Sequence, residues 1–148
     1  MDPGTYTYFK DLEWRDYFRS TRSHNTITID SQDQSIPGGR FLYKYQAKSE
    51  CLEFRDGESV TGRHYGFTRL PDPVIHTRRI LLKSATQEIE IQDTLTGKSP
   101  HILNQLFHFH PDCRVERSGP NRYEGHPSAG PKVEFLMDSQ ASWNLVRG

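Results

Sequence analysis

The sequence predicts an all-β protein of roughly ten or more short strands, arranged as an antiparallel β-sandwich or a barrel. Candidate strands recur at short, regular intervals along most of the chain. Turn residues rich in glycine, proline, asparagine and aspartate separate them, as in hairpin connections. No helix of ordinary length is visible in the hydrophobic pattern, so we expect strands to build the core.

Composition limits the size and the partners of the fold. A chain of 148 residues fits one domain, and we expect a single β-sandwich domain over residues 1–148. Its 19 basic and 19 acidic residues give a net charge of zero, so we expect no nucleic-acid or membrane partner. No apolar run approaches the ~18 residues of a membrane span. The chain opens on a turn and ends on a strand-like run, so we expect it to be a fragment of a larger protein.

The first polar motif pairs a turn with an alternating strand. Asp2 precedes a Pro-Gly turn that leads to a threonine- and tyrosine-rich strand over residues 5–9. In the strand that begins at residue 25, Ile27 and Ile29 point to the core, and His24 lies on the opposite, polar face. Asp2 and His24 are therefore a candidate metal or catalytic pair.

Residues 10–22 are dense in charged and aromatic side chains without a clear period, which predicts a long ordered loop. Arg19 and Arg22 can bind anionic sugars, because a guanidinium donates two parallel hydrogen bonds to a carboxylate or sulfate. The alternative is a loop anchored by Trp14 and Phe18, with solvated arginines. Both interpretations stay open at this point.

The later strands follow the same reasoning. Alternation over residues 88–93 predicts that Ile89 and Ile91 are buried. Residues 121–131 are rich in glycine and proline, which predicts a mobile loop. The predicted strands are 41–47, 51–55, 59–67, 74–83, 88–93, 102–109, 113–116, 132–137 and 141–146.

Two histidine patterns could carry chemistry. His108 and His110 would share one face of a strand, which suits either a metal site or ordinary hydrogen-bonded histidines. His76 and Arg78 would share a face too, lining a polar groove or an exposed sheet face with acidic neighbours.

The two cysteines, Cys51 and Cys113, can pair in an oxidising compartment or stay reduced. Cys51 falls within a predicted strand, where packing is its ordinary role. No nucleophile motif or phosphate-binding glycine loop occurs in the sequence.

Several motifs together resemble the C-terminal β-sandwich region of heparinase II/III-like proteins. The opening Asp-Pro-Gly-Thr-Tyr-Thr-Tyr run and the Ser-Thr-Arg-Ser-His-Asn-Thr run carry most of this resemblance, with later support from Arg-Arg-Ile, Ile-Gln-Asp and Phe-His-Phe-His-Pro. With the segment Arg15–Arg19 and with Asp30, which also belong to the resemblance, these motifs occupy residues 2–8, 15–19, 20–26, 30, 78–80, 91–93 and 107–111.

The resemblance implies a bacterial polysaccharide lyase that cleaves uronic-acid polymers, such as glycosaminoglycans, by β-elimination. It implies an upstream helical toroid domain, with the anionic polysaccharide bound between toroid and sandwich. The catalytic base and acid would lie upstream, so we expect the isolated fragment to be inactive. A periplasmic or secreted parent is implied, and a sandwich without its toroid is expected to self-associate.

The resemblance also implies site residues. Asp2 and His24 match two zinc ligands, with a third expected from an upstream His-x-His element, so the zinc site is partial and can be empty in the fragment. Tyr6 and Tyr8 would lie beside the substrate cleft, where they contact sugar or pack within the sheet.

Three alternatives belong to other classes. One is a non-catalytic carbohydrate-binding or scaffolding sandwich. Another is a family member without lyase activity that serves bacterial polysaccharide assembly. The third is an independent metalloenzyme built on His108 and His110.

Overall fold

The computed structural model describes residues 3–4, 6–7, 10–39 and 41–146. They belong to two compact units, Asp2–Leu106 and Phe107–Gly148. No helix within these described ranges is long and apolar enough to cross a bilayer. The prediction of one domain over residues 1–148 stays a prediction.

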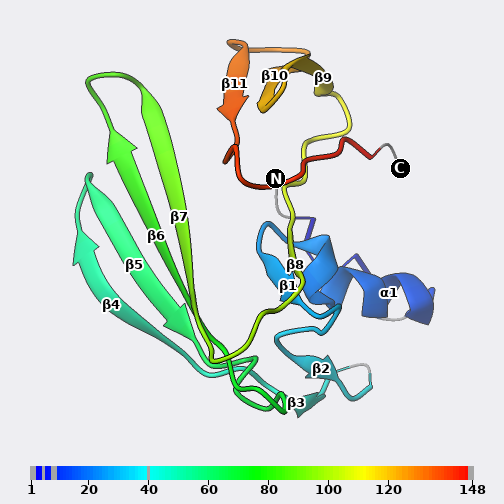
Figure 1. The fold of residues 1–148 in the computed structure, drawn as a ribbon. Helices are drawn as coiled ribbons and strands as arrows, with labels where there is room; N and C mark the ends of the chain where they lie inside the picture. Colours follow the sequence, from blue (N-terminus) through cyan, green and yellow to red (C-terminus); the bar gives the residue numbers. More distant parts are fainter. Residues whose placement is uncertain (1–2, 5, 8–9, 40, 147–148) are drawn as a thin grey trace. The chain divides into compact units, whose positions relative to one another are not determined.

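The described part of the first unit contains a helix, a short 3₁₀ helix and eight strands (Figure 1). These elements are α1 (Leu12–Arg19), η1 (Thr21–Ser23), β1 (Ile27–Ile29), β2 (Ile36–Pro37), β3 (Tyr43–Tyr45), β4 (Ser49–Arg55), β5 (Ser59–His64), β6 (Ile75–Lys83), β7 (Glu88–Thr96) and β8 (Leu103–Gln105). The second unit contains β9 (Arg114–Gly119), β10 (Arg122–His126) and β11 (Val133–Leu136).

Every strand pair is antiparallel. In the first unit β4, β5, β6 and β7 form one sheet in that order, and β1–β8 and β2–β3 form two small pairs. In the second unit β10 lies between β9 and β11. The all-β prediction is confirmed.

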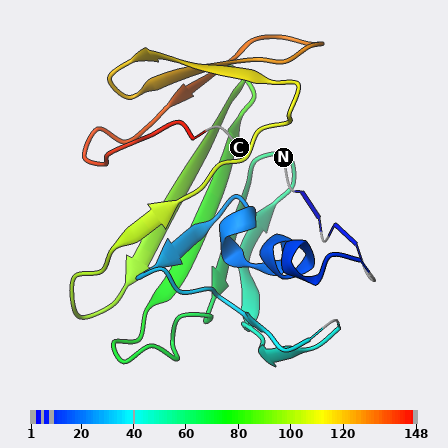
Figure 2. The ribbon, with the colours of Figure 1, turned by 90° about the vertical axis from the view of Figure 1, so that its right-hand side faces the viewer.

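The core of the first unit lies where β1 packs against the end of the large sheet. Ile27 is 3% exposed and Ile29 is 0% exposed, so their predicted burial is confirmed. They pack with Phe67, which follows β5, and Val74, which precedes β6. Figure 2 shows the β1–β8 pair lying over the long strands as a second layer.

The prediction of a loop over residues 10–22 is wrong, because α1 forms there. The two buried residues of this helix are Arg15 and Arg19, four positions apart and therefore on one face. Arg15 Nη1 donates to the carbonyl of Thr7 at 2.7 Å. The aromatic side chains at positions 14, 17 and 18 have the i, i+3, i+4 spacing of one helix face, but arginines occupy the buried face, so the sequence carried a helical signal that its charged residues obscured.

The predicted strand over residues 5–9 falls mostly outside the described residues. Of its members, Tyr6 and Thr7 are described, and neither lies in a strand. Tyr6 has a positive φ of 63°, a conformation that does not continue a strand.

The predicted burial of Ile89 and Ile91 is wrong, since they are 67% and 38% exposed. They pair with Leu82 and Ile80, and cross-strand partners share a face. This face also carries Phe54, which is 68% exposed. The β1–β8 layer packs against the other end of the sheet, so alternation identified the apolar face but not whether another layer covers it.

The second unit has its own small core. Val115 and Tyr123 are 8% and 5% exposed, and the Tyr123 hydroxyl donates to the carbonyl of Trp143 at 3.0 Å. The loop predicted over residues 121–131 is wrong in its first half, where β10 forms, and the strand predicted over 141–146 is absent.

Candidate functional site

His24 stands at the junction between η1 and β1, and local hydrogen bonds fix its backbone. Its N–H donates to the carbonyl of Thr21 at 3.2 Å, and its carbonyl accepts from the N–H of Thr26 at 2.9 Å. Asp33 Oδ1 accepts from the Thr21 N–H at 2.8 Å, which ties η1 to the chain beyond β1. The half-buried His24 is therefore presented from a braced turn.

The residues after His24 are held from two further elements. The carbonyl of Thr26 accepts from the N–H of Leu106, at the end of β8, at 2.9 Å. The carbonyl of Asn25 accepts from Nη1 of Arg78 on β6. The His24 segment, defined as residues 24–26, is thus fixed by η1, β6 and the chain after β8.

Arg78 is itself held by Asp93 on β7. Its Nε donates to Asp93 Oδ1 at 2.7 Å and its Nη2 to Oδ2 at 2.8 Å, a bidentate pair that fixes the guanidinium plane. Gln105 Nε2 donates to Oδ2 at 2.8 Å. The Asp93 side chain is only 7% exposed, and these donors compensate its burial.

A chain of two imidazoles also ends on Asp93. The N–H of Gly66 donates to His64 Nδ1 at 3.1 Å, so the proton of His64 lies on Nε2. His64 Nε2 then donates to His76 Nδ1 at 2.9 Å, and His76 Nε2 donates to Asp93 Oδ1 at 2.6 Å. The hydrogen-bond pattern assigns one tautomer to each neutral ring.

The electrostatics agree with this assignment. Burial, followed by the nearby His76 and Arg78, lowers the pKa of His64 to about 4. Burial pushes the pKa of Asp93 upward, but hydrogen bonds from His76 and Arg78 outweigh it and hold the pKa below its ordinary value. At neutral pH the network therefore contains a carboxylate, a guanidinium and an uncharged His64.

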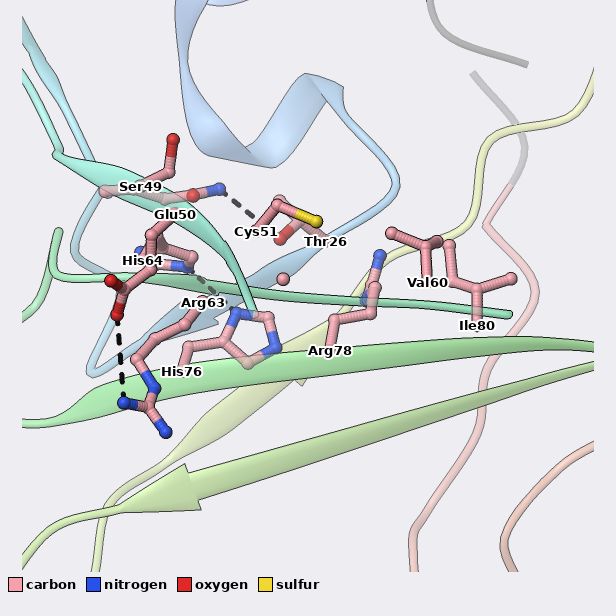
Figure 3. Close-up of a pocket in the computed structure, with 12 residues that line it drawn as sticks. Thr26, Ser49, Glu50, Cys51, Val60, Arg63, His64, His76, Arg78 and Ile80 are labelled. Atoms are coloured by element: carbon pink, nitrogen blue, oxygen red, sulfur yellow. Dashed lines mark hydrogen bonds and ion pairs between the residues drawn. The ribbon is translucent and has the colours of Figure 1, made fainter. Parts of the chain in front are cut away.

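The network forms one wall of a hollow of about 480 Å³ on the sheet face (Figure 3). Arg78, Arg63 and Cys51 line it from the strands, and Thr26 lines it from the His24 segment. A volume of this order suits a small ligand or one sugar unit. His76 and Arg78 therefore line this hollow together with apolar Val60 and Ile80, and His76, 2% exposed, does not lie on an open sheet face.

A second polar cluster lies apart from this hollow in the first unit. His101 Nδ1 lies 2.7 Å from Asp30 Oδ2, and its Nε2 lies 3.0 Å from Asp72 Oδ2. Hydrogen bonding to Asp30 is the main cause that raises the pKa of His101. The imidazole bridges the turn after β1 and the loop before β6.

The predicted metal ligands are only partly within the described structure. Asp2 lies outside the described residues, as does Tyr8, whereas His24 is positioned as above. In the described ranges, no group of three or more His, Cys, Asp or Glu side chains is placed to hold a metal ion. The zinc assignment stays a prediction.

The other predicted substrate contacts have distinct surroundings. Tyr6 is 59% exposed and stacks on Phe18, with ring centroids 5.3 Å apart, and Arg22 is exposed. Arg19 is 7% exposed, and its two Nη atoms donate to the carbonyls of Gly39 and Leu42 at 2.5 and 2.8 Å. Contact between Arg19 and a polysaccharide stays a prediction that competes with these bonds.

The prediction of a shared strand for His108 and His110 is wrong. β8 ends at Gln105, and both histidines lie in the irregular segment that follows. His110 is exposed, and its Nδ1 lies 3.6 Å from Asp112 Oδ2. Strand alternation therefore does not place these two rings on one face. Cys51 and Cys113 are both free thiols, and Cys51 lies in β4 as predicted.

The sequence alone did not single out His64. The register pairs it with His76 and pairs Arg78 with Asp93 on the same sheet face. The spacing held a partial signal. Positions 76 and 78 on β6 lie two residues apart, as do their partners 95 and 93 on β7, so all four side chains share one sheet face. The sequence does not show which residues of β5, β6 and β7 lie opposite one another, and this register is needed to place His64 beside His76 and Arg78 beside Asp93.

A known protein family matches most of the chain. The family described as "Heparinase II/III-like, C-terminal" matches residues 1–142. The chain belongs to this heparinase II/III-like family. Neither the curated proteins nor the solved structures yielded a match. Membership in the heparinase II/III-like family supports a domain related to polysaccharide lyases, and the His24 segment lies within the matched region.

Proposed function

We propose that this chain is the β-sandwich half of a lyase that cleaves uronic-acid-containing polysaccharide by β-elimination. The family match over residues 1–142 is the observation that carries this proposal. The chain would act with an upstream helical toroid domain, which supplies the catalytic base and acid. The whole protein would be bacterial and periplasmic or secreted, where anionic polysaccharides are accessible.

The proposed reaction needs no water. A base removes the proton from C5 beside the uronate carboxylate, the electron pair forms a C4–C5 double bond, and the C4–O4 bond breaks as an acid protonates O4. Neutralisation of the uronate carboxylate makes the C5 proton more acidic. Exposed Arg22 and Tyr6 are suited to hold an acidic sugar by charge and by stacking. Arg19 and Tyr8 are further proposed contacts.

Asp2 and His24 would hold a zinc ion together with an imidazole from the upstream segment. A carboxylate and neutral imidazoles are ordinary zinc ligands, so the donor chemistry fits. The bracing of His24 by Thr21 and Thr26 also suits a ligand that must keep a fixed position. When bound, zinc would supply a fixed positive charge that shapes this end of the sandwich, and in the isolated chain the site can be empty.

Exposed aromatic side chains favour a second candidate, carbohydrate binding without catalysis. Trp14 and Tyr17 on α1 are 56% and 40% exposed, and their rings contact each other edge to face at 5.8 Å. Aromatic faces of this kind stack on sugar rings. A family member without lyase activity that serves polysaccharide assembly would use the same surface.

The test is ultraviolet detection of unsaturated uronic ends, which only β-elimination produces. The full-length gene product would be incubated with a panel of uronate polymers, beside His24→Ala and a matched His110→Ala control. We expect product with the intact protein and the control, and a strong reduction with His24→Ala. Polymer binding without product from any variant would favour the carbohydrate-binding alternative.

A further inference from the structure

We infer that Arg78 is a positioning residue for His24, acting through the main chain of the His24 segment. This inference rests on the proposed zinc role of His24 and extends it to a residue on another strand. Arg78 Nη1 donates to the carbonyl of Asn25, the residue directly after His24. This contact joins residues 53 positions apart in the sequence.

The direction of the Arg78 side chain is fixed before it reaches Asn25. Nε and Nη2 occupy both oxygens of Asp93, so the guanidinium plane is set by β7. Asp93 is held in turn by His76 and Gln105, at 2.6 and 2.8 Å. The remaining Nη1 therefore meets the Asn25 carbonyl from a rigid support rather than from a mobile surface side chain.

The Asn25 carbonyl lies in the peptide plane between Asn25 and Thr26, and the N–H of that plane donates to the His24 carbonyl at 2.9 Å, so a bond that holds this plane also supports the peptide that follows the His24 Cα. Residues 24–26 form no hydrogen-bonded strand of their own before Ile27, and His24 has extended dihedrals of φ −117° and ψ 163°. A carbonyl free to rotate would let the His24 Cα–Cβ direction vary. Support of this kind around a metal ligand typically contributes 10- to 100-fold in metal affinity.

Lysine could not replace this function. A guanidinium can donate to Asp93 from one edge and to Asn25 from another, because its five N–H groups form a rigid fork. A lysine ammonium carries its three N–H groups on one nitrogen, which cannot take the separate positions of Nε and Nη2 at Asp93 and of Nη1 at Asn25. Arg78→Lys therefore keeps a positive charge beside Asp93 but removes the hydrogen bond to Asn25, so the two contributions can be tested separately.

Arg63 provides a matched control in the same hollow. It lines the hollow from β5, and its Nε donates to Thr77 Oγ1 at 3.3 Å. Its Nη1 lies 3.8 Å from Glu50 Oε1, so its described partners belong to the sheet. Arg63→Gln removes a guanidinium from the hollow without removing the bond to Asn25.

The experiment measures zinc affinity by chelator competition in the full-length gene product. Arg78→Gln, Arg78→Lys, Arg63→Gln and His24→Ala would be compared with wild type, along with thermal unfolding without metal and the visible spectrum of bound cobalt(II). We expect about 10- to 100-fold weaker zinc binding and an altered cobalt spectrum for both Arg78 variants, with Arg63→Gln within about twofold of wild type. His24→Ala should abolish tight binding.

The outcomes separate the two levels of the proposal. If wild type binds zinc and His24→Ala does not, but both Arg78 variants bind like Arg63→Gln, the positioning role is wrong and the zinc site stands. If wild type binds no zinc, or His24→Ala keeps it, the proposed zinc role fails and the inference falls with it. Should Arg78→Gln unfold, Arg78→Lys, which keeps the charge beside Asp93, decides between these results.

Discussion

His64 Nε2 lies 2.9 Å from His76 Nδ1, at the centre of a relay that begins at the main chain of Gly66 and ends on Asp93. In this arrangement each ring has one nitrogen that accepts and one that donates, which is the hydrogen-bond pattern of a neutral imidazole. The relay joins β5, β6 and β7, and through Arg78 it reaches the segment that carries His24.

Acid should weaken the fold through His64. Its pKa is about 4 in the folded protein against 6.5 ordinarily, so the unfolded chain binds a proton that the folded chain resists. This contribution is present above pH 6.5 and is lost as pH falls from 6.5 towards 4, on the order of 2 kcal/mol after allowance for solvent screening. Urea unfolding of His64→Gln across this range should give a shallower pH dependence than wild type.

The exposed His110 supplies the control for that measurement. His110→Gln should leave the acid slope as in wild type. Parallel stability curves for wild type and His64→Gln would show that His64 does not carry the acid sensitivity.

His101 should act in the opposite direction. Its pKa is raised, so its ion pairs stabilise the fold below the ordinary histidine pKa and are lost as pH rises through the raised value. Hydrogen bonds from His101 and from the Ile102 N–H lower the pKa of Asp30, and bonds from Ser99 and His101 lower the pKa of Asp72, so the contribution of both carboxylates is lost in acid. The ion pairs of His101 with Asp30 and Asp72 therefore stabilise the fold most at pH values above the lowered carboxyl pKa values and below the raised pKa of His101.

His101→Gln should therefore lower the thermal midpoint by a few degrees at about pH 6, and the difference from wild type should shrink at about pH 9. Differential scanning calorimetry at both pH values checks this. A difference in thermal midpoint that is the same or larger at the higher pH would contradict stabilisation by a charged His101.

The core of the first unit could be predicted in part from the sequence. Alternation around Ile27 and Ile29 gave the correct core face, although Thr28 between them is buried as well, because β1 is covered on both faces. Helix α1 was not predicted, because arginines rather than apolar residues occupy its buried face, although the aromatic residues at positions 14, 17 and 18 have helical spacing. His64 and Asp93 were not recognised because cross-strand register, rather than local pattern, brings them together.

Arg19 should be important for stability. Its guanidinium donates to Gly39 and Leu42 and lies over the Tyr43 ring, 4.6 Å from the ring centroid. Arg19→Lys loses the fork, and we expect a loss of about 1–3 kcal/mol in unfolding free energy. Exposed Arg22→Lys should stay within about 0.5 kcal/mol. Equal effects in urea denaturation would contradict the anchoring role.

Self-association of the 148-residue chain should depend on the exposed apolar face of the large sheet. Ile89 is 67% exposed on this face, and Ile89→Lys should reduce oligomers with a stability change within about 0.5 kcal/mol. Gln92→Lys, on the opposite face of β7, is the control and should leave association unchanged. Sedimentation velocity checks both variants. Association that is absent in wild type, or equally reduced by both changes, would count against this surface.

The central claim is that His24 is a zinc ligand within a lyase of the heparinase II/III-like family. The most direct measurement is the zinc content of the full-length gene product after dialysis, for wild type, His24→Ala and His110→Ala. We expect about one zinc per chain in wild type and His110→Ala and almost none in His24→Ala. Full zinc content in His24→Ala would contradict the claim.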